Sequence, residues 1–218
     1  MPKSRSRIAL LGWGSLLWDQ RNEFDEQHEP WQFDGPDLKL EFSRISASRG
    51  GALTLVIDIA NGDSCRSAYA ISRRADPDDA IVDLRCREGT VMRHMGFYFR
   101  DGSRRGLPDI PETIPPWAEL HKFDVVVWTG LPSNFEKETG QPFSVSNAIK
   151  HLQTLNARGK ASAAEYIWRA PELVDTRLRA ALQSEPWFAA DPKTSTDSVL
   201  DADGREVHSA IKGDGPRG

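Results

Sequence analysis

The feature that most constrains the fold is an apolar run that breaks into a glycine-rich turn. Residues 7–11 are apolar enough to form a buried strand, and the chain continues as Gly-Trp-Gly-Ser over residues 12–15. Glycine permits positive φ and lets a ligand approach the main chain closely. Consecutive N–H groups in such a turn form a concavity that binds anions. The sequence therefore predicts a strand followed by a binding loop, made of Gly12, Trp13, Gly14, Ser15 and Leu16.

The composition narrows the classes of protein that this chain can belong to. Its 218 residues include 28 basic and 32 acidic ones, well mixed along the chain, with a formal net charge of -4. This balance argues against a nucleic-acid or membrane-surface partner, and no apolar run approaches the ~20 residues that a membrane-spanning helix needs. Two isolated cysteines, Cys65 and Cys86, suit the reducing cytosol. We expect a cytoplasmic protein without nucleic-acid or membrane partners, and its oligomeric state stays open.

Short strands and turns are expected to dominate the first ~130 residues. Alternating apolar and polar residues predict a half-buried strand over residues 38–42, and β-favouring residues predict a central strand over 52–60. Further strands are expected over residues 67–73, 91–100 and 123–129, with turns over residues 44–51 and 61–64. Glycines and prolines forbid regular structure across residues 101–118.

Helices are expected at three places. Asp76 can cap a helix that has Pro77 at its first position, continues to Glu88 and stops at Gly89. Later helices are expected between Ser144 and Gly159 and from Pro171 onward. This order predicts an α+β fold, in which helices flank a small mixed or antiparallel β-sheet or β-barrel. Residues 1–188 are expected to form one domain and residues 189–218 a polar C-terminal tail.

The carboxylate at the end of the first helix is a candidate for proton transfer. Ile81, Leu84 and Glu88 share one helix face, so Glu88 should point the way of its apolar neighbours. Burial and the negative end of the helix dipole would both raise its pKa, as a proton shuttle requires. Periodicity alone leaves a plainer alternative open, in which Glu88 is solvated at the rim or paired with Arg85 or Arg87.

Two motifs together resemble the gamma-glutamylcyclotransferase-like superfamily. Residues 12–18 are similar to its Y-G-S-L loop, and closest to the G-Y-G-S-L-I-W form of ChaC-like proteins. Residues 87–89, Arg-Glu-Gly, resemble the R-E-G or E-G element that carries the catalytic glutamate of that superfamily. The resemblance covers residues 7–130 and more loosely the helical part. Trp13 stands where the family usually has tyrosine, a change that keeps the backbone cradle and removes a phenolic contact.

The resemblance implies a gamma-glutamylcyclotransferase-like fold and a cyclisation that needs no metal or cofactor. A γ-glutamyl amide or amine would close to 5-oxoproline and expel its amine, with Glu88 as general acid and base and residues 12–16 holding the glutamyl moiety. Five scattered histidines agree with the expectation of no metal, because they lack ligand spacing. Arg44, beside a Ser- and Gly-rich turn, and Tyr98, as part of the pocket wall, are further candidates for substrate binding.

Other functions stay open at this point. The same fold can serve a non-catalytic small-molecule-binding or interaction protein, or an amide hydrolase in which Glu88 activates water. Ser15 is a poor candidate nucleophile, because Trp13 and Leu17 occupy the glycine positions of a G-x-S-x-G elbow. His94 can approach Glu88 across the sheet, although a core or surface histidine is the more ordinary interpretation.

Overall fold

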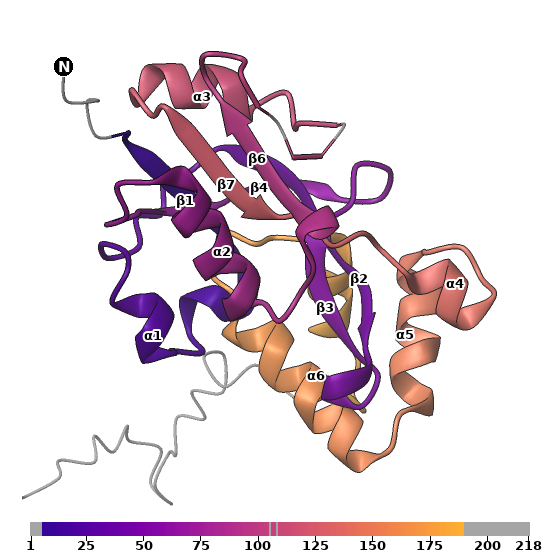
Figure 1. The fold of residues 1–218 in the computed structure, drawn as a ribbon. Coiled ribbons are helices and arrows are strands. Elements are labelled where there is room, and N and C mark those ends of the chain that lie inside the picture. Colours follow the sequence, from indigo (N-terminus) through magenta and orange to yellow (C-terminus); the bar gives the residue numbers. More distant parts are fainter. Residues whose placement is uncertain (1–5, 105, 108, 190–218) are drawn as a thin grey trace, which may run out of the picture.

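Two separate β-sheets form the centre of the fold, in a computed structural model that describes residues 6–104, 106–107 and 109–189 (Figure 1). The first sheet has the strand order β5-β1-β7-β6, in which β1 and β7 are parallel and the other pairs antiparallel. Its strands are β1 (Ile8–Gly12), β5 (Ala68–Ile71), β6 (Met95–Phe99) and β7 (Val125–Thr129). The second sheet, order β3-β2-β4, is antiparallel. It consists of β2 (Asp37–Ser46), β3 (Ala52–Ile57) and β4 (Asp63–Arg66).

The described strands stay in two open sheets and do not close into a barrel. The predicted α+β class is therefore correct, and in place of a single sheet or barrel the strands form two open sheets, the first mixed and the second antiparallel. Strand β1 is buried on both faces. Ile8 and Leu10 pack in the cluster beneath α2 (Pro77–Arg87), whereas Ala9 and Leu11 join the larger core between the sheets and the remaining helices. This double burial explains why residues 8–11 are a continuous apolar run.

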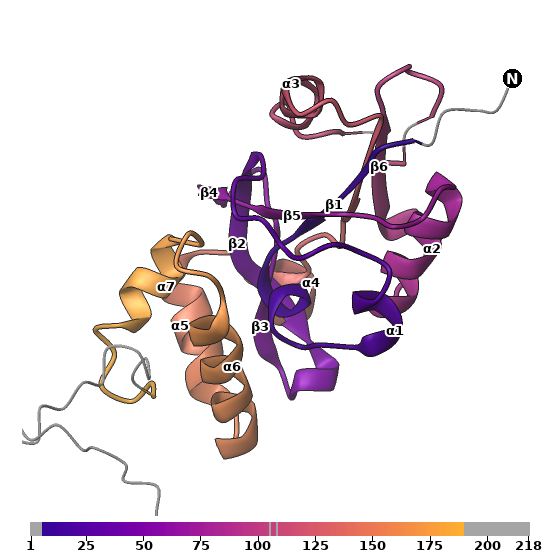
Figure 2. The same cartoon turned by 90° about the vertical axis from the view of Figure 1, so that its left-hand side faces the viewer.

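The helices divide between the two sheets (Figure 2). Helix α2 packs on the first sheet through β1, β6 and β7, and α6 (Ala157–Arg169) and α7 (Arg177–Leu182) pack on the second. The other α-helices of the described residues are α1 (Asn22–Asp25), α3 (Ile114–Leu120), α4 (Phe135–Thr139) and α5 (Val145–Thr154). The described part of the chain also contains three short 3-10 helices, η1 (Gly14–Leu17), η2 (Ala47–Arg49) and η3 (Met92–His94). Among the described residues, no helix is both long and apolar enough to cross a membrane.

Several predicted element boundaries are wrong in the strand region. Strand β2 continues through Ser46, so the turn expected from residue 44 begins later. The turn expected over residues 61–64 overlaps β4, and η3 occupies the start of the strand expected over 91–100. Helix α3 forms inside the stretch predicted to be irregular, because its prolines fall in the first helical turn, where no intrahelical N–H bond is lost.

The boundaries of the late helices also differ from the prediction. Gly159 does not end a helix: Leu155 ends α5, and Asn156 caps α6, in which Gly159 is an internal residue. Gly159 is required there by close packing, since a Cβ atom would lie 2.6 Å from the carbonyl oxygen of Gly50. Helix α7 begins at Arg177 with Thr176 as its cap, not at Pro171. The expected polar tail lies outside the described residues except for Ala189.

Candidate functional site

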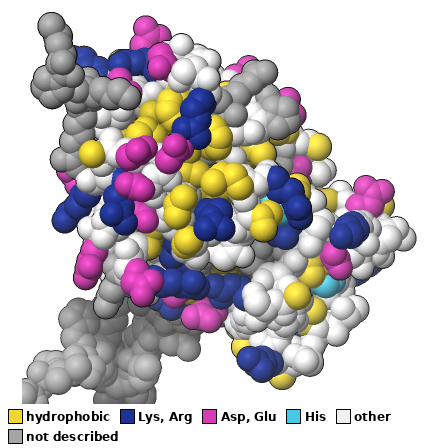
Figure 3. Space-filling model, in the orientation of Figure 1, with side chains coloured by type: hydrophobic (Ala, Val, Ile, Leu, Met, Phe, Trp, Pro, Cys, Tyr) yellow, Lys and Arg dark blue, Asp and Glu magenta, His cyan; other side chains and the backbone are white. Residues whose placement is uncertain are grey.

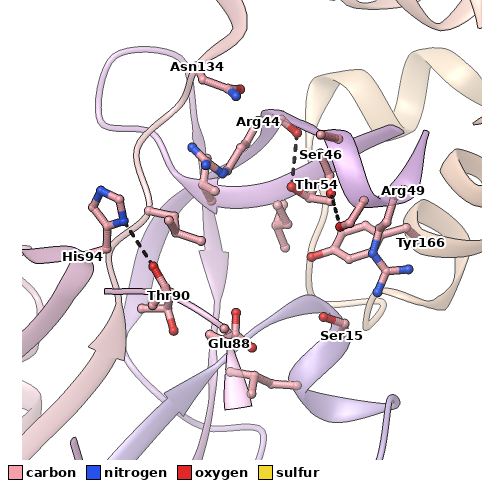
Figure 4. A pocket seen from close by; sticks show the side chains of 18 of the residues that line it. Ser15, Arg44, Ser46, Arg49, Thr54, Glu88, Thr90, His94, Asn134 and Tyr166 are labelled. Carbon is pink, nitrogen blue, oxygen red and sulfur yellow. Dashed lines mark hydrogen bonds between the residues drawn. The ribbon is translucent and has the colours of Figure 1, made fainter. Parts of the chain in front are cut away.

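A cavity of about 790 Å³ opens where η1, the C-terminal end of α2, the β2–β3 hairpin and α6 meet. Its lining includes the predicted residues Trp13, Ser15, Leu16, Arg44 and Glu88. Figure 4 shows how the side chains converge: Glu88 lies between Ser15 and Tyr166 on one side and Thr90 and His94 on the other. The structure thus brings the glycine-rich loop and the helix-end carboxylate, which are far apart in sequence, to one cavity.

The loop after β1 takes the shape that its glycines allow. Trp13, the residue before η1, is extended, with φ -154° and ψ 151°, and Gly14, the first residue of η1, has a left-handed φ of +69°. A Cβ atom at Gly14 would lie only 2.6 Å from the hydroxyl oxygen of Tyr166, so glycine is required for packing as well as for conformation. Hydrogen bonds in a 3-10 helix join residues three apart, so the first three N–H groups of η1 have no acceptor within it. The N–H of Ser15 bonds the Tyr166 hydroxyl, which leaves the N–H groups of Gly14 and Leu16 without an acceptor inside the turn.

Helix α2 ends in a way that sets the position of Glu88. The helix starts at the predicted cap, where Asp76 accepts a hydrogen bond from the N–H of Asp78 at 2.9 Å. At the other end, the N–H of Thr90 donates to the carbonyl of Arg85 and that of Gly89 to the carbonyl of Cys86. These two bonds form a Schellman motif around Gly89, whose φ is +57°. The predicted C-terminal glycine is confirmed, and Glu88 is the last residue before the chain turns.

Arg87 joins the end of α2 to the glycine-rich loop. Its side chain is 3% exposed, and Nη2 donates to the carbonyl oxygens of Ser15 at 3.2 Å and Asp19 at 2.6 Å. Its Nη1 lies 3.6 Å from the Glu88 carboxylate. Because one buried side chain contacts the loop and the glutamate, Arg87 holds the two halves of the site in register.

The environment of the Glu88 carboxyl favours its neutral form. The side chain is 18% exposed, and desolvation by burial raises the pKa of Glu88 above its usual value. Arg87, Arg21 and Arg49 oppose this shift, in that order, and Asp19 adds to it. The predicted inward direction of Glu88 is therefore confirmed, and a pairing with Arg87, which the sequence left as an alternative, is also present.

Tyr166 places a phenolic hydroxyl beside the loop, from an element that the motifs do not include. Its side chain comes from α6 and is buried, and its hydroxyl lies against Gly14. Burial raises the pKa of Tyr166, an effect that backbone hydrogen bonds from Leu55 and Ser15 partly oppose.

A β-bulge turns Arg44 toward the cavity. The β2–β3 register shifts between Glu41 and Arg44, and such a bulge re-aims the side chains that follow it. The segment after β7 holds the distorted strand, because the Asn134 side chain accepts from the N–H of Ile45 at 2.7 Å and donates to its carbonyl at 3.1 Å. Arg44 itself donates from Nη1 to the carbonyl of Pro132 at 2.8 Å, which leaves its Nη2 end free to contact a ligand.

Two hydroxyl groups and a histidine complete the wall near Arg44. Thr90 Oγ1 lies 3.1 Å from His94 Nδ1. Desolvation, followed by the charges of Arg93 and Arg44, lowers the pKa of His94. Thr129 also lines the cavity, and its hydroxyl is buried without a hydrogen-bond partner among the described residues.

Three of the predicted site residues, Gly12, Gly14 and Tyr98, do not line the cavity. Gly14 lies against the Tyr166 hydroxyl. Gly12 does not line the cavity; a Cβ atom there would lie 2.7 Å from the Trp31 ring, so this glycine serves packing. Tyr98, in β6, pairs with Val126 of β7 and packs against the larger core, away from the cavity lining. Among the described residues, no three His, Cys, Asp or Glu side chains gather as metal ligands would.

Sequence patterns missed several residues that line the cavity, above all Tyr166 and Thr129. Arg49 also lines it and, like Arg44, flanks the Ser- and Gly-rich turn, which made it a candidate contact for an anionic group. Arg49 lies over the rings of Trp18 and Tyr166, at 5.5 and 5.0 Å from their centroids, which orients its guanidinium at the cavity wall.

Comparison with known proteins gives one distant similarity. No protein-family model matches the chain, and no solved structure matches it either. A short chain dehydrogenase of Pseudocercospora fijiensis (strain CIRAD86) is 25% identical over 141 residues, which is 60% of this chain. The aligned part spans 41% of that relative's length. The described strands include only one parallel pair, β1 and β7, whereas a dinucleotide-binding fold is built on a mostly parallel sheet.

Proposed function

We propose that this protein is a gamma-glutamylcyclotransferase-type enzyme, which converts a γ-glutamyl amide or amine to 5-oxoproline and a free amine. The observation that carries the proposal is the shared cavity of Glu88 and the loop at Ser15 and Leu16. The raised pKa of Glu88 supports it, because a carboxyl poised towards neutrality can both accept and return a proton near cellular pH.

The reaction needs no nucleophile from the protein. The α-amine of the substrate attacks its own γ-carbonyl carbon, a C–N bond closes the five-membered ring, and the bond to the leaving nitrogen breaks. Glu88 takes one proton from the attacking nitrogen and returns it to the leaving nitrogen, so the carboxylate is regenerated. Holding the substrate folded contributes most of the advantage, since well-oriented intramolecular reactions reach effective molarities on the order of 10⁵–10⁸ M.

Groups on the loop side of the cavity suit the glutamyl moiety. The N–H of Leu16 in η1 and the Tyr166 hydroxyl are candidate donors for the developing oxyanion or the α-carboxylate. The Arg49 guanidinium adds a positive charge on the same side, as Figure 4 shows. Arg87 acts as a positioning residue, because its guanidinium contacts a carbonyl of the loop and the Glu88 carboxylate, and so holds both in place.

The test is a product assay with Glu88→Gln. The purified protein is incubated with glutathione, γ-glutamyl amino acids and γ-glutamyl amines, and 5-oxoproline is measured. We expect Glu88→Gln to unfold at a temperature close to that of the unaltered protein and to lose turnover by about 10²- to 10⁴-fold. Glu165→Gln, which changes an exposed carboxylate on α6, is the matched control. Full activity of Glu88→Gln would refute the assignment.

Two other outcomes separate the alternative functions. Release of free glutamate instead of 5-oxoproline would identify an amide hydrolase in which Glu88 activates water. No product from any substrate, together with ligand-induced thermal stabilisation, would identify a non-catalytic binding protein on the same fold. Either outcome would replace the proposed reaction.

A further inference from the structure

The segment between η1 and β2 packs against the site, although the proposed reaction gives it no task. Phe24, in the single turn of α1, is buried in the same cluster as Leu84 of α2. Trp31 lies against Gly12 at the end of β1, so closely that a Cβ atom there would be 2.7 Å from its ring. The segment is therefore fixed at two points, on the helix that leads to Glu88 and on the strand that leads into the glycine-rich loop.

Acidic and basic side chains lie together where this segment meets α2. Figure 3 shows them beside one another over the part of the molecule where Figure 1 draws α1 and α2. Arg21 Nη2 lies 3.4 Å from the Asp19 carboxylate, and Arg87 Nη2 lies 3.6 Å from the same group. Asp19 therefore joins Arg21 to Arg87, whose guanidinium contacts Glu88.

Arg21 also bonds the last turn of α2 directly. Its Nη1 donates to the carbonyl oxygen of Arg87 at 3.2 Å. Carbonyl groups in the last turn of a helix have no partner inside the helix and carry a partial negative charge, so a guanidinium satisfies and neutralises them. Arg21 lines the cavity as well, and among the charges that act on the Glu88 carboxyl its effect is second to that of Arg87.

Asp25 and His28 hold the backbone of Arg21 in place. The Asp25 carboxylate accepts from the N–H of Arg21 at 2.6 Å, and the N–H of Asp25 donates to the Arg21 carbonyl at 3.0 Å. The same carboxylate lies 3.3 Å from Nε2 of His28, a residue that is 6% exposed and whose Nδ1 lies 2.6 Å from the carbonyl oxygen of Glu29. Because a helix of one turn is marginal by itself, these contacts decide where the chain places Arg21.

We propose that residues 19–28 form a clasp, in which Asp25 and His28 hold Arg21 against the last turn of α2 so that Arg21 positions the Glu88 carboxylate. Arg21 is a positioning residue in this role, because it acts through the end of the helix and through Glu88 and not on the reacting atoms. The catalytic meaning of the clasp rests on the proposed function. Its effect on the Glu88 carboxyl does not, and can be measured without a substrate.

The titratable and charged groups that face Glu88 come from several elements. They are Arg87 of α2, Arg21 and Asp19 of the clasp, Arg49 of η2, Tyr166 of α6 and, on the opposite side in Figure 4, His94 of η3. Of these groups, Arg21 is the one that α1 holds. A change in α1 should therefore reach the Glu88 carboxyl through Arg21, while the other groups stay in place.

The first test measures the ionisation of Glu88 after Arg21 is replaced. The protein is labelled with ¹³C at its glutamate carboxyls, the Glu88 resonance is assigned by its absence in Glu88→Gln, and its chemical shift is followed by NMR as pH rises. Because Arg21 lowers the pKa of Glu88, we expect the midpoint in Arg21→Met to lie at higher pH than in the unaltered protein.

The same change should appear in turnover. On the acid limb of the pH profile, kcat/KM for 5-oxoproline formation should fall by about 1.5- to 5-fold in Arg21→Met, as the loss of one half-exposed charge pair provides. The ionisation of the substrate is common to all variants and does not affect the comparison. Arg66→Met is the matched control, since Arg66 is 47% exposed against 55% for Arg21, pairs with Asp37 and lies outside the cavity lining.

The second test separates positioning from the direct effect of a charge. Loss of the Asp25 charge alone would favour ionised Glu88 and move its midpoint to lower pH. Asp25→Ala removes both the charge and the bond to the Arg21 N–H, and the clasp predicts a midpoint at higher pH. Asp25→Asn loses the same charge but keeps an acceptor oxygen for Arg21, so its midpoint should lie below that of Asp25→Ala.

The failures of the two proposals are distinguishable. An unmoved midpoint in Arg21→Met, or equal midpoints in Asp25→Ala and Asp25→Asn, would overturn the clasp and leave the cyclotransferase reaction standing. No 5-oxoproline from any substrate, together with the expected midpoints, would overturn the proposed function and leave the clasp as the device that sets the ionisation of Glu88. If Asp25→Ala does not fold, Arg21→Met decides, because a half-exposed side chain can be replaced without opening the core.

Discussion

Replacing the buried carboxyl of Glu41 should stabilise the protein at neutral pH and have little effect in acid. Glu41 lies on β2, is 0% exposed, and accepts a hydrogen bond from the N–H of Phe42 at 2.7 Å. Desolvation by burial raises its pKa from 4.5 to about 7, and the bond from Phe42 opposes this shift only in part. Glu41→Gln keeps the acceptor for Phe42 and removes the charge.

The sign and the size of the effect follow from the two pKa values. Between pH 4.5 and 7 the unfolded chain loses its Glu41 proton while the folded chain retains it, so this group lowers the free energy of unfolding as pH rises. The loss is complete above pH 7 and amounts to about 3 kcal/mol, at 1.36 kcal/mol for each pKa unit. We therefore expect Glu41→Gln to gain about 3 kcal/mol over the unaltered protein at pH 8 and to match it near pH 4.

Urea unfolding at a series of pH values between 4 and 8 measures this difference. Because other carboxyls contribute a pH dependence of their own, the informative quantity is the difference in free energy of unfolding between Glu41→Gln and the unaltered protein. Glu26→Gln, at an exposed position, is the control for removal of one surface carboxylate. A difference that stays constant across the pH series, or a variant less stable at pH 8, would refute the reasoning.

Three further predictions concern the site and the helix that carries it. Arg49→Met should move the acid limb of the pH–rate profile for 5-oxoproline formation to higher pH, because Arg49 lowers the pKa of Glu88; an unmoved limb would contradict this. Gly89→Ala should cost about 1 kcal/mol in urea unfolding from backbone strain alone, since φ is +57° and a Cβ atom would meet nothing within 4 Å. An alkylating reagent should label exposed Cys86 well before Cys65, whose thiol pKa burial raises to about 11; mass spectrometry of the peptides reads the order.

Local patterns were sufficient for the elements that carry the two motifs. The cap at Asp76, the shared face of Ile81 and Leu84 and the glycine at position 89 predicted helix α2 and the inward direction of Glu88, because these signals act within a few turns of chain. Local patterns gave wrong helix boundaries where the conformation of a segment depends on its place in the fold. The prolines of α3 look irregular until their place in the first turn is known, and Gly159 looks like a helix end although it is a close contact with Gly50.

The sequence by itself determined that a strand ends in a glycine loop and that a helix ends in a carboxylate, since each depends on residues adjacent in the chain. Only the tertiary structure decided that the loop and Glu88 share a cavity, that Arg87 joins them, and that Gly12 and Tyr98 serve packing instead. It also decided that the phenol beside the loop comes from Tyr166, since a hydroxyl packed against Gly14 from a distant helix leaves no periodic signal. Such contacts depend on how the sheets and helices pack, and packing joins residues that no local pattern relates.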